Sequence, residues 1–185
     1  MISMDNGKSP EQIPPRPPGI PRWLAITLAP IVLLIGAPAV HAGIPWLLSH
    51  LGPRFGWADG SPSVWNLIGV VSLAVGAVLL VWIMIFEFTQ NLPEWVPIDW
   101  RPVILMTGGP YALSRNPMYI AELALWLGMA VLYGSPVVLA GFAIWIVVMR
   151  RLTVKEERGL ESAYGDIYLR YKARVPRWLV LPRRA

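Results

Sequence analysis

The sequence has no cysteine among its 185 residues, and it is poor in charge. The missing cysteines exclude disulfide bonds and thiolate metal ligands, and they leave the redox compartment undecided. Charged residues make up only 15% of the chain, whereas hydrophobic residues make up 55% and there are 10 tryptophans. That balance is typical of a membrane protein. At this length we expect a single domain.

The basic residues are concentrated near the C-terminus, where residues 150–185 hold ten of the 16 lysines and arginines. A basic stretch of this kind can bind nucleic acid, but the cytosolic bias of basic residues in membrane proteins explains it with fewer assumptions. We therefore expect no nucleic-acid partner. Arg54 is the one basic residue in the predicted outer loops, so we expect both termini in the cytosol. If the protein is bacterial, we expect it in the cytoplasmic membrane.

Four apolar stretches predict membrane-spanning helices, at about residues 23–42, 65–87, 117–133 and 136–152. A helix needs about 20 apolar residues to cross a bilayer. The second stretch is the clearest, because residues 67–86 contain no charge. The predicted fold class is therefore an all-α integral membrane protein with about four transmembrane helices. The bilayer is then an expected partner.

Outside these spans we expect a tail, an interfacial segment and a cytosolic helix. Residues 1–22 are polar and rich in proline and predict a flexible cytosolic tail before a membrane domain at 23–180. Residues 43–51 predict a separate interfacial segment. Apolar positions between 160 and 171 recur at helical spacing, so we expect an amphipathic cytosolic helix within the C-terminal part, 153–180. In the second span small residues share one face, which permits close packing or a homodimer: Gly69, Ser72 and Gly76.

Two histidines, His41 and His50, are the chain's only ones. They can be metal ligands, but isolated histidines beside a membrane interface are more often plain polar residues. We assign them no chemistry and expect no metal site.

A glycine- and proline-rich turn at residues 108–119 precedes the third apolar helix. Asn116 suits an N-cap and Pro117 suits the first helical position. The third and fourth spans have nearly equal lengths and meet at a tight turn at 134–135, so the chain beyond 152 returns level with Asn116. We therefore expect the Glu156–Glu157 pair to meet the 108–119 turn and to form an active site.

Simpler interpretations exist for each motif. Asn116 and Pro117 can be a helix start and nothing more, and Glu156–Glu157 can pair with neighbouring arginines on a solvated helix face. The presence of both motifs at the same end of one hairpin, with tyrosines following, favours an enzyme.

The combined pattern resembles a known family. Gly-Pro-Tyr, Arg-Asn-Pro-Met-Tyr, the hairpin, Glu-Glu, then Tyr-Gly and Val-Pro resemble the membrane methyltransferases over about residues 103–180. These comprise the isoprenylcysteine carboxyl methyltransferases and the phospholipid (phosphatidylethanolamine) N-methyltransferases. At Asn116 the isoprenylcysteine branch carries histidine, whereas the phospholipid branch is similar to this chain.

The resemblance implies S-adenosylmethionine as methyl donor, with S-adenosylhomocysteine as product. It implies a lipophilic acceptor, either a phospholipid amine or an isoprenylcysteine-like carboxylate. The implied cofactor contacts are Leu105, Met106, Tyr111, Asn116, Pro117, Met118, Tyr119 and Glu157.

Two further residues are expected to be catalytic. Glu122 is an ionisable residue inside a predicted span, and such residues either face a polar cavity or extend to the interface. The resemblance implies an arginine shortly before the glutamates that serves the substrate; Thr153 stands at that position and Arg151 is nearby. Alternatives to a methyltransferase are a small sterol-reductase-like NADPH enzyme and a non-catalytic adaptor that recruits a partner through residues 10–21.

Overall fold

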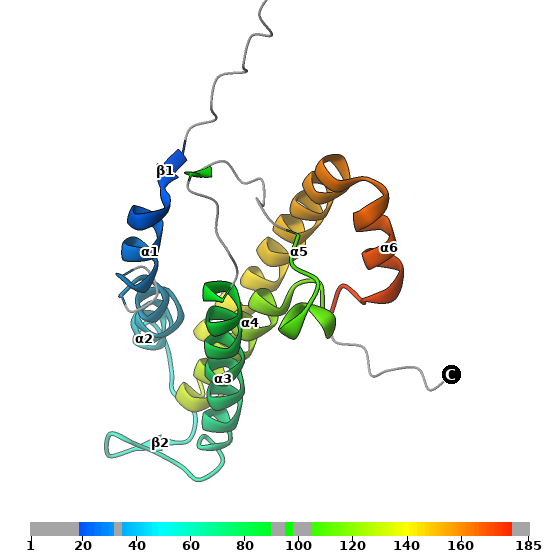
Figure 1. Ribbon diagram of the computed structural model, residues 1–185. Coiled ribbons are helices and arrows are strands. Elements are labelled where there is room, and N and C mark those ends of the chain that lie inside the picture. Colours follow the sequence, from blue (N-terminus) through cyan, green and yellow to red (C-terminus); the bar gives the residue numbers. More distant parts are fainter. Residues whose placement is uncertain (1–18, 32–34, 90–94, 98–104, 179–185) are drawn as a thin grey trace, which may run out of the picture.

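A computed structural model describes residues 19–31, 35–89, 95–97 and 105–178, and three long helices dominate it (Figure 1): α3 (Ile68–Phe88), α4 (Pro117–Tyr133) and α5 (Pro136–Tyr164). Ile68–Glu87 and α5 are long and apolar enough to cross a membrane, and α4 is an apolar helix of 17 residues. Two of the four predicted spans therefore hold helices that are candidates for crossing a membrane, and the helix in the third is shorter.

The predicted first span is not one regular helix. α1 (Arg22–Ile31) is followed, beyond the undescribed residues 32–34, by a π-helical turn, η2 (Ala39–Gly43), and then directly by α2 (Ile44–Ser49). The π turn begins directly after Pro38, which lacks the N–H that a regular helix would use. Residues 43–51, expected as a separate interfacial segment, are therefore mostly a continuation of this helical segment.

Two short strand pairs also depart from the all-α expectation. β1 (Gly19–Pro21) pairs antiparallel with β4 (Trp95–Pro97), and β2 (Trp57–Ala58) pairs with β3 (Ser61–Pro62). Residues 19–21 were expected within a flexible tail; residues 1–18 of that tail lie outside the described residues. The β2–β3 turn is Asp59-Gly60, both at positive φ (49° and 75°), as tight hairpins require.

The small-residue face of α3 packs against α4 of the same chain. A Cβ on Gly69 would lie 2.5 Å from the carbonyl oxygen of Gly128, and one on Gly76 would lie 2.8 Å from that of Ala121. Between them, Ser72 donates a hydrogen bond of 2.8 Å to the Ala124 carbonyl. The expected close packing is confirmed. α4 of the same chain occupies this face, and a homodimer stays a prediction.

Gly69→Ala should destabilise the protein by about 1–3 kcal/mol, because the added methyl group would press on helix backbone that cannot move aside. Gly159→Ala is the matched control, since a Cβ there meets nothing within 4 Å. In a helix that change should stabilise by about 0.5–1 kcal/mol. Unfolding in mixed detergent measures both, and equal effects of the two substitutions would contradict the packing described.

The predicted hairpin of α4 and α5 is confirmed, including its turn. Gly134 has φ 55°, and a Cβ there would lie 2.0 Å from the Phe55 carbonyl oxygen, so the site requires glycine. The hydroxyl of Ser135 caps α5 by accepting a hydrogen bond from the Val138 N–H.

α5 is longer than the span that was predicted. Its 29 residues extend about 43 Å, more than the hydrocarbon core of about 30 Å, so part of its charged C-terminal half exceeds the length that a bilayer requires. The helix ends at Gly165 (φ 50°), and α6 (Asp166–Arg174) follows at a new angle (Figure 1). The single amphipathic helix expected over 160–171 is therefore two helices, because the glycine permits a break.

Candidate active site

The carboxylate of Glu157 is the centre of a buried polar network that joins α5 to the start of α4, far from the turn of the hairpin. Glu157 is only 4% exposed. Arg177 donates to both of its oxygens, from Nε at 3.0 Å and Nη2 at 2.7 Å. Arg115 Nη1 lies 3.3 Å from Oε1, and Asn116 Nδ2 donates to the same oxygen at 3.4 Å. The return of the glutamate pair to the 108–119 turn is thus confirmed.

Asn116 occupies the N-cap position of α4, but its side chain does not cap the helix. The amide instead donates to Glu157 and, at 3.2 Å, to the carbonyl of Arg177. The expectation of a side-chain cap is therefore wrong, because the amide points at the glutamate and at the C-terminal segment and not at the first N–H groups of α4.

The segment 175–178, which we call the C-terminal latch, closes over this network. Ser114 is fully buried, and its hydroxyl donates to the Arg177 carbonyl at 3.0 Å. The Arg115 N–H donates to the Pro176 carbonyl at 2.9 Å. The latch and the turn are therefore joined both by backbone contacts and by the ion pair of Glu157 and Arg177.

The local electrostatics favour the charged form of Glu157. Burial acts to raise the pKa of its carboxyl, but the hydrogen bond from Arg177 and the charges of Arg115 and Arg177 outweigh it, and the pKa lies below its ordinary value of 4.5. Burial and the neighbouring Glu87 carboxylate raise the pKa of the Tyr111 hydroxyl well above its ordinary value, so this tyrosine stays neutral.

Two predicted cofactor-binding tyrosines donate hydrogen bonds to carboxylates. Tyr111 donates to Glu87 of α3 at 2.6 Å, and Tyr119 donates to Glu156 at 2.5 Å. The two carboxylates of the pair therefore have different partners: Glu156 accepts from Tyr119, and Glu157 binds the two arginines. Tyr171 of α6 donates to the Tyr111 backbone carbonyl at 2.6 Å, which fixes the turn from the other side.

A cavity of about 650 Å³ lies between the N-terminal helical segment, α3, α4 and α5. Met118 and Glu122 line it together with Glu87, which links it to Tyr111. Its other polar groups are His41 and Trp145, and the remaining lining is apolar. Glu122 thus lines a cavity, and its catalytic role stays a prediction.

His41 is the residue of this cavity that sequence reasoning missed. It is 8% exposed, and its Nε2 lies 4.0 Å from Oε1 of Glu122. The sequence offers one signal, Pro38 inside an apolar helix, which marks the irregular turn that carries His41. Its partner follows only from the packing of η2 against α4.

The other predicted site residues are placed less centrally. Leu105 and Met106 are half-buried in the segment that leads into η3 (Gly109–Ala112). Arg151 is exposed beside Arg150 and Val154 on α5, and the structure does not bring it to Glu157 or Glu122. It lies six residues before Glu157, which places it on a different face of the helix.

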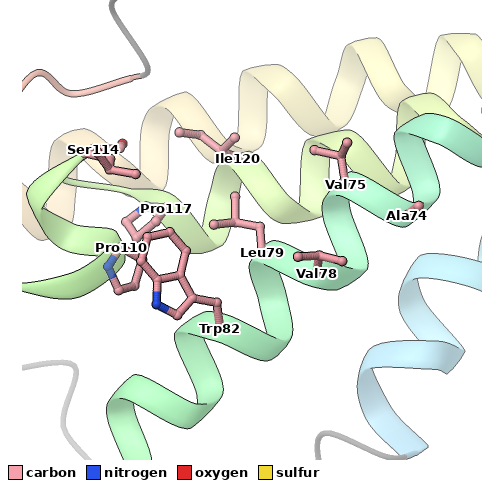
Figure 2. A pocket seen from close by; sticks show the side chains of 10 residues that line it. Ala74, Val75, Val78, Leu79, Trp82, Pro110, Ser114, Pro117 and Ile120 are labelled. Atoms are coloured by element: carbon pink, nitrogen blue, oxygen red, sulfur yellow. The ribbon is translucent and has the colours of Figure 1, made fainter. Parts of the chain in front are cut away.

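Pro117, at the start of α4, lines a separate apolar groove of about 430 Å³ between α3 and the 108–119 turn. Figure 2 shows Leu79 and Trp82 of α3 beside Pro110 and Pro117. The groove adjoins the polar network through Ser114, which lines it and whose hydroxyl holds the latch.

The sequence is similar to those of several known proteins. An uncharacterized protein of Haemophilus influenzae is 38% identical over 63 residues, which are 34% of this chain and all of that protein. The protein-S-isoprenylcysteine O-methyltransferase of Schizosaccharomyces pombe is 36% identical over 75 residues, 40% of this chain and 31% of that enzyme. The cobalt-zinc-cadmium resistance protein CzcN of Cupriavidus metallidurans is 34% identical over 73 residues, 39% of this chain and 33% of that protein.

The match therefore spans about a third of each of these two named relatives. No solved structure matches the chain. The sequence profile described as phospholipid methyltransferase matches residues 64–167, which is more than half of the chain and runs from the start of α3 to the start of α6. The chain belongs to the phospholipid methyltransferase family.

Proposed function

We propose that this membrane protein transfers a methyl group from S-adenosylmethionine to the amine of a lipid. One observation carries the proposal. The turn and the glutamate pair typical of the family meet beside a cavity whose charged groups, among the described residues, are carboxylates. The placement of both termini in the cytosol is part of the same proposal, supported by the basic C-terminal part of the chain.

The residues of the site fit a cationic methyl donor. S-adenosylmethionine carries a sulfonium and an ammonium group, and when bound it supplies an electrophilic methyl group. The rings of Tyr111 and Tyr119 offer π faces for a cation, and Glu87 and Glu156 supply negative charge beside them. Met118, another predicted cofactor residue, lines the cavity itself, and Tyr111 is linked to it through Glu87.

Glu157 has a different part in this proposal from the one the sequence suggested. Both its oxygens are held by protein groups, so it acts on the cofactor through Arg177, whose side chain remains 36% exposed. A guanidinium held in this way suits the carboxylate of the cofactor. Arg115 completes the cationic side of the network.

The cavity favours an amine over a carboxylate as the acceptor. None of the described residues that line it is lysine or arginine, whereas Glu87 and Glu122 would attract an ammonium group. An amine must be neutral to attack, and a nearby carboxylate can take its proton. The groove beside Pro117 is apolar except for Ser114 and would suit an acyl chain. The protein's contribution is then to align the acceptor and to exclude water.

A second acceptor class is an isoprenylcysteine-like carboxylate, favoured by the similarity to the Schizosaccharomyces pombe enzyme. The adaptor alternative depends on residues 10–21, which lie outside the described residues. Nothing in the described part of the chain favours it or the reductase.

Calorimetry on the detergent-solubilised protein tests the proposal. We expect S-adenosylmethionine and S-adenosylhomocysteine to bind and NADPH not to bind. Labelled methyl groups should then appear on an amine phospholipid when the protein is incubated with a total lipid extract. Binding of NADPH alone would support the reductase, and absence of binding by all three would support a non-catalytic protein. Label found only on carboxylates or on water-soluble acceptors would contradict the amine-lipid assignment.

A further inference from the structure

The cavity between η2, α3, α4 and α5 contains polar atoms that lack partners within the protein. Nδ1 of His41 and Nε1 of Trp145 are buried and form no hydrogen bond. The two rings lie edge to face with centroids 6.4 Å apart. Buried polar atoms without partners cost free energy unless water or a ligand satisfies them. Both atoms are almost fully covered by protein atoms, so the wall of the cavity beside them carries unsatisfied polar groups that a ligand reaches only if a ring moves.

The spacing of His41 and Glu122 indicates what kind of group fits. Their closest atoms, Nε2 and Oε1, are 4.0 Å apart, which is too long for a hydrogen bond between them. A primary amine that donates two hydrogen bonds of about 2.9 Å at a tetrahedral angle holds its two acceptors about 4.7 Å apart, so His41 and Glu122 need to separate by only about 0.7 Å to share one amine. An NH₂ group placed between the two side chains would satisfy both.

The tautomer that accepts at Nε2 also explains the orphan atoms. With Nε2 as the acceptor, Nδ1 carries the hydrogen, and the Trp145 Nε1 is always a donor. Both unpartnered groups are then donors, and oxygens of a lipid head group would be their natural acceptors.

We propose that His41 and Glu122 together bind the acceptor amine and that His41 accepts its proton during methyl transfer. This inference rests on the proposed function. The amine nitrogen forms a bond to the methyl carbon, while the carbon–sulfur bond of the donor breaks and its electron pair stays on sulfur. The nitrogen, now positively charged, loses one proton to Nε2 of His41. Glu122 stabilises the resulting imidazolium.

Other titratable groups around His41 are less well placed for this role. The described residues of the cavity include one further carboxylate, Glu87 of α3, which already accepts a hydrogen bond from Tyr111. The lining residue from α5 is Trp145, which does not titrate. The second histidine, His50, is exposed and lies near Arg54, with its Nδ1 2.8 Å from the carbonyl of Trp46.

Because the chain has only two histidines, carbon-labelled histidine gives one signal from each ring, and His50→Gln assigns them. We expect dodecylamine, added to the protein in phosphatidylcholine nanodiscs, to shift the His41 signal and leave His50 unchanged. Dodecanoate should shift neither signal. In Glu122→Gln the amine should shift the His41 signal much less. An unmoved His41 signal in the wild-type protein would overturn the inference.

Turnover provides the second readout. His41→Gln should lower methyl transfer about 100-fold, in the range of a lost general base, while S-adenosylhomocysteine binds within twofold of the wild-type affinity. The retained affinity shows that the variant is folded. Turnover within threefold of wild type would overturn the inference and leave the proposed function standing. If the wild-type protein methylates no lipid, the proposed function fails, and the His41 signal alone decides whether the pair binds an amine.

Discussion

Replacing Glu157 by glutamine should weaken S-adenosylhomocysteine binding at least tenfold and destabilise the protein by about 3 kcal/mol. The carboxylate is 4% exposed and pairs with Arg115, itself buried, and with half-buried Arg177. Removing one partner of a buried ion pair leaves the opposite charge without compensation, which costs about 3–5 kcal/mol. The lower end applies here, because Arg177 is partly solvated.

Glu161→Gln is the matched control on the same helix. Glu161 pairs with Lys172, but both side chains are about a third exposed, and a pair of this kind contributes about 0–1 kcal/mol. Thermal unfolding in detergent and calorimetry with the cofactor product measure the two expected effects. Equal losses in Glu157→Gln and Glu161→Gln would contradict the central role of the buried network.

Arg177→Ala separates two explanations of a binding defect in Glu157→Gln. If Glu157 acts through Arg177, both substitutions weaken cofactor binding to a similar degree. If Glu157 contacts the cofactor itself, Arg177→Ala frees Oε2 of its carboxylate, while Oε1 stays paired with Arg115 and Asn116, and binding is retained or strengthened. In either case hydrogen exchange in the latch, residues 175–178, should increase, because the ion pair joins the latch to α5.

The same network predicts a pH dependence of stability. The folded-state pKa of Glu157 lies below its ordinary value of 4.5, so its contribution is fully present above about pH 4.5 and is lost as the pH falls through the lower, folded-state value. The wild-type protein and Glu157→Gln should therefore differ by a constant amount between about pH 6 and 8. The difference should shrink only under acidic conditions.

The hairpin and its turn could be predicted from the sequence because local rules decide them. Equal apolar lengths, Pro117 at a helix start and the glycine at 134 specify two antiparallel helices, and this alone brings Asn116 to Glu157. The packing face of α3 was equally visible, since small residues at helical spacing mark close contact. Which helix it meets depends on the folded arrangement and not on the spacing.

The contacts that the sequence did not reveal all join distant parts of the chain. Arg177 lies 20 residues from Glu157, and nothing local to either residue specifies their pairing. His41 reaches Glu122 only because η2 packs beside α4. Arg151 was assigned a role because it lies close to the glutamates in the sequence. The direction of a side chain on a helix changes by about 100° with each residue, so closeness in sequence does not bring it to the same face. Contacts of this kind are set by packing.

Replacing Glu122 by glutamine should lower methyl transfer about 100-fold while cofactor affinity stays within twofold. Glutamine keeps the size of the side chain but loses the charge that attracts an ammonium group and stabilises a protonated His41. The pH dependence of turnover should change as well, because a titrating group of the cavity has been removed. Unchanged turnover with an unchanged pH profile would show that Glu122 is only structural.

The double variant His41→Gln/Glu122→Gln gives the most direct evidence that the two residues act together. If they bind and deprotonate one amine as a unit, the second substitution costs little once the first has been made, and the double variant should be nearly as active as the slower single variant. If each acts alone, the losses multiply to about 10,000-fold. Glu161→Gln combined with His41→Gln is the control, because Glu161 lies outside the cavity and its small effect should simply add. If the losses of His41→Gln and Glu122→Gln multiply, the two residues do not act as a unit, even if both are required for activity.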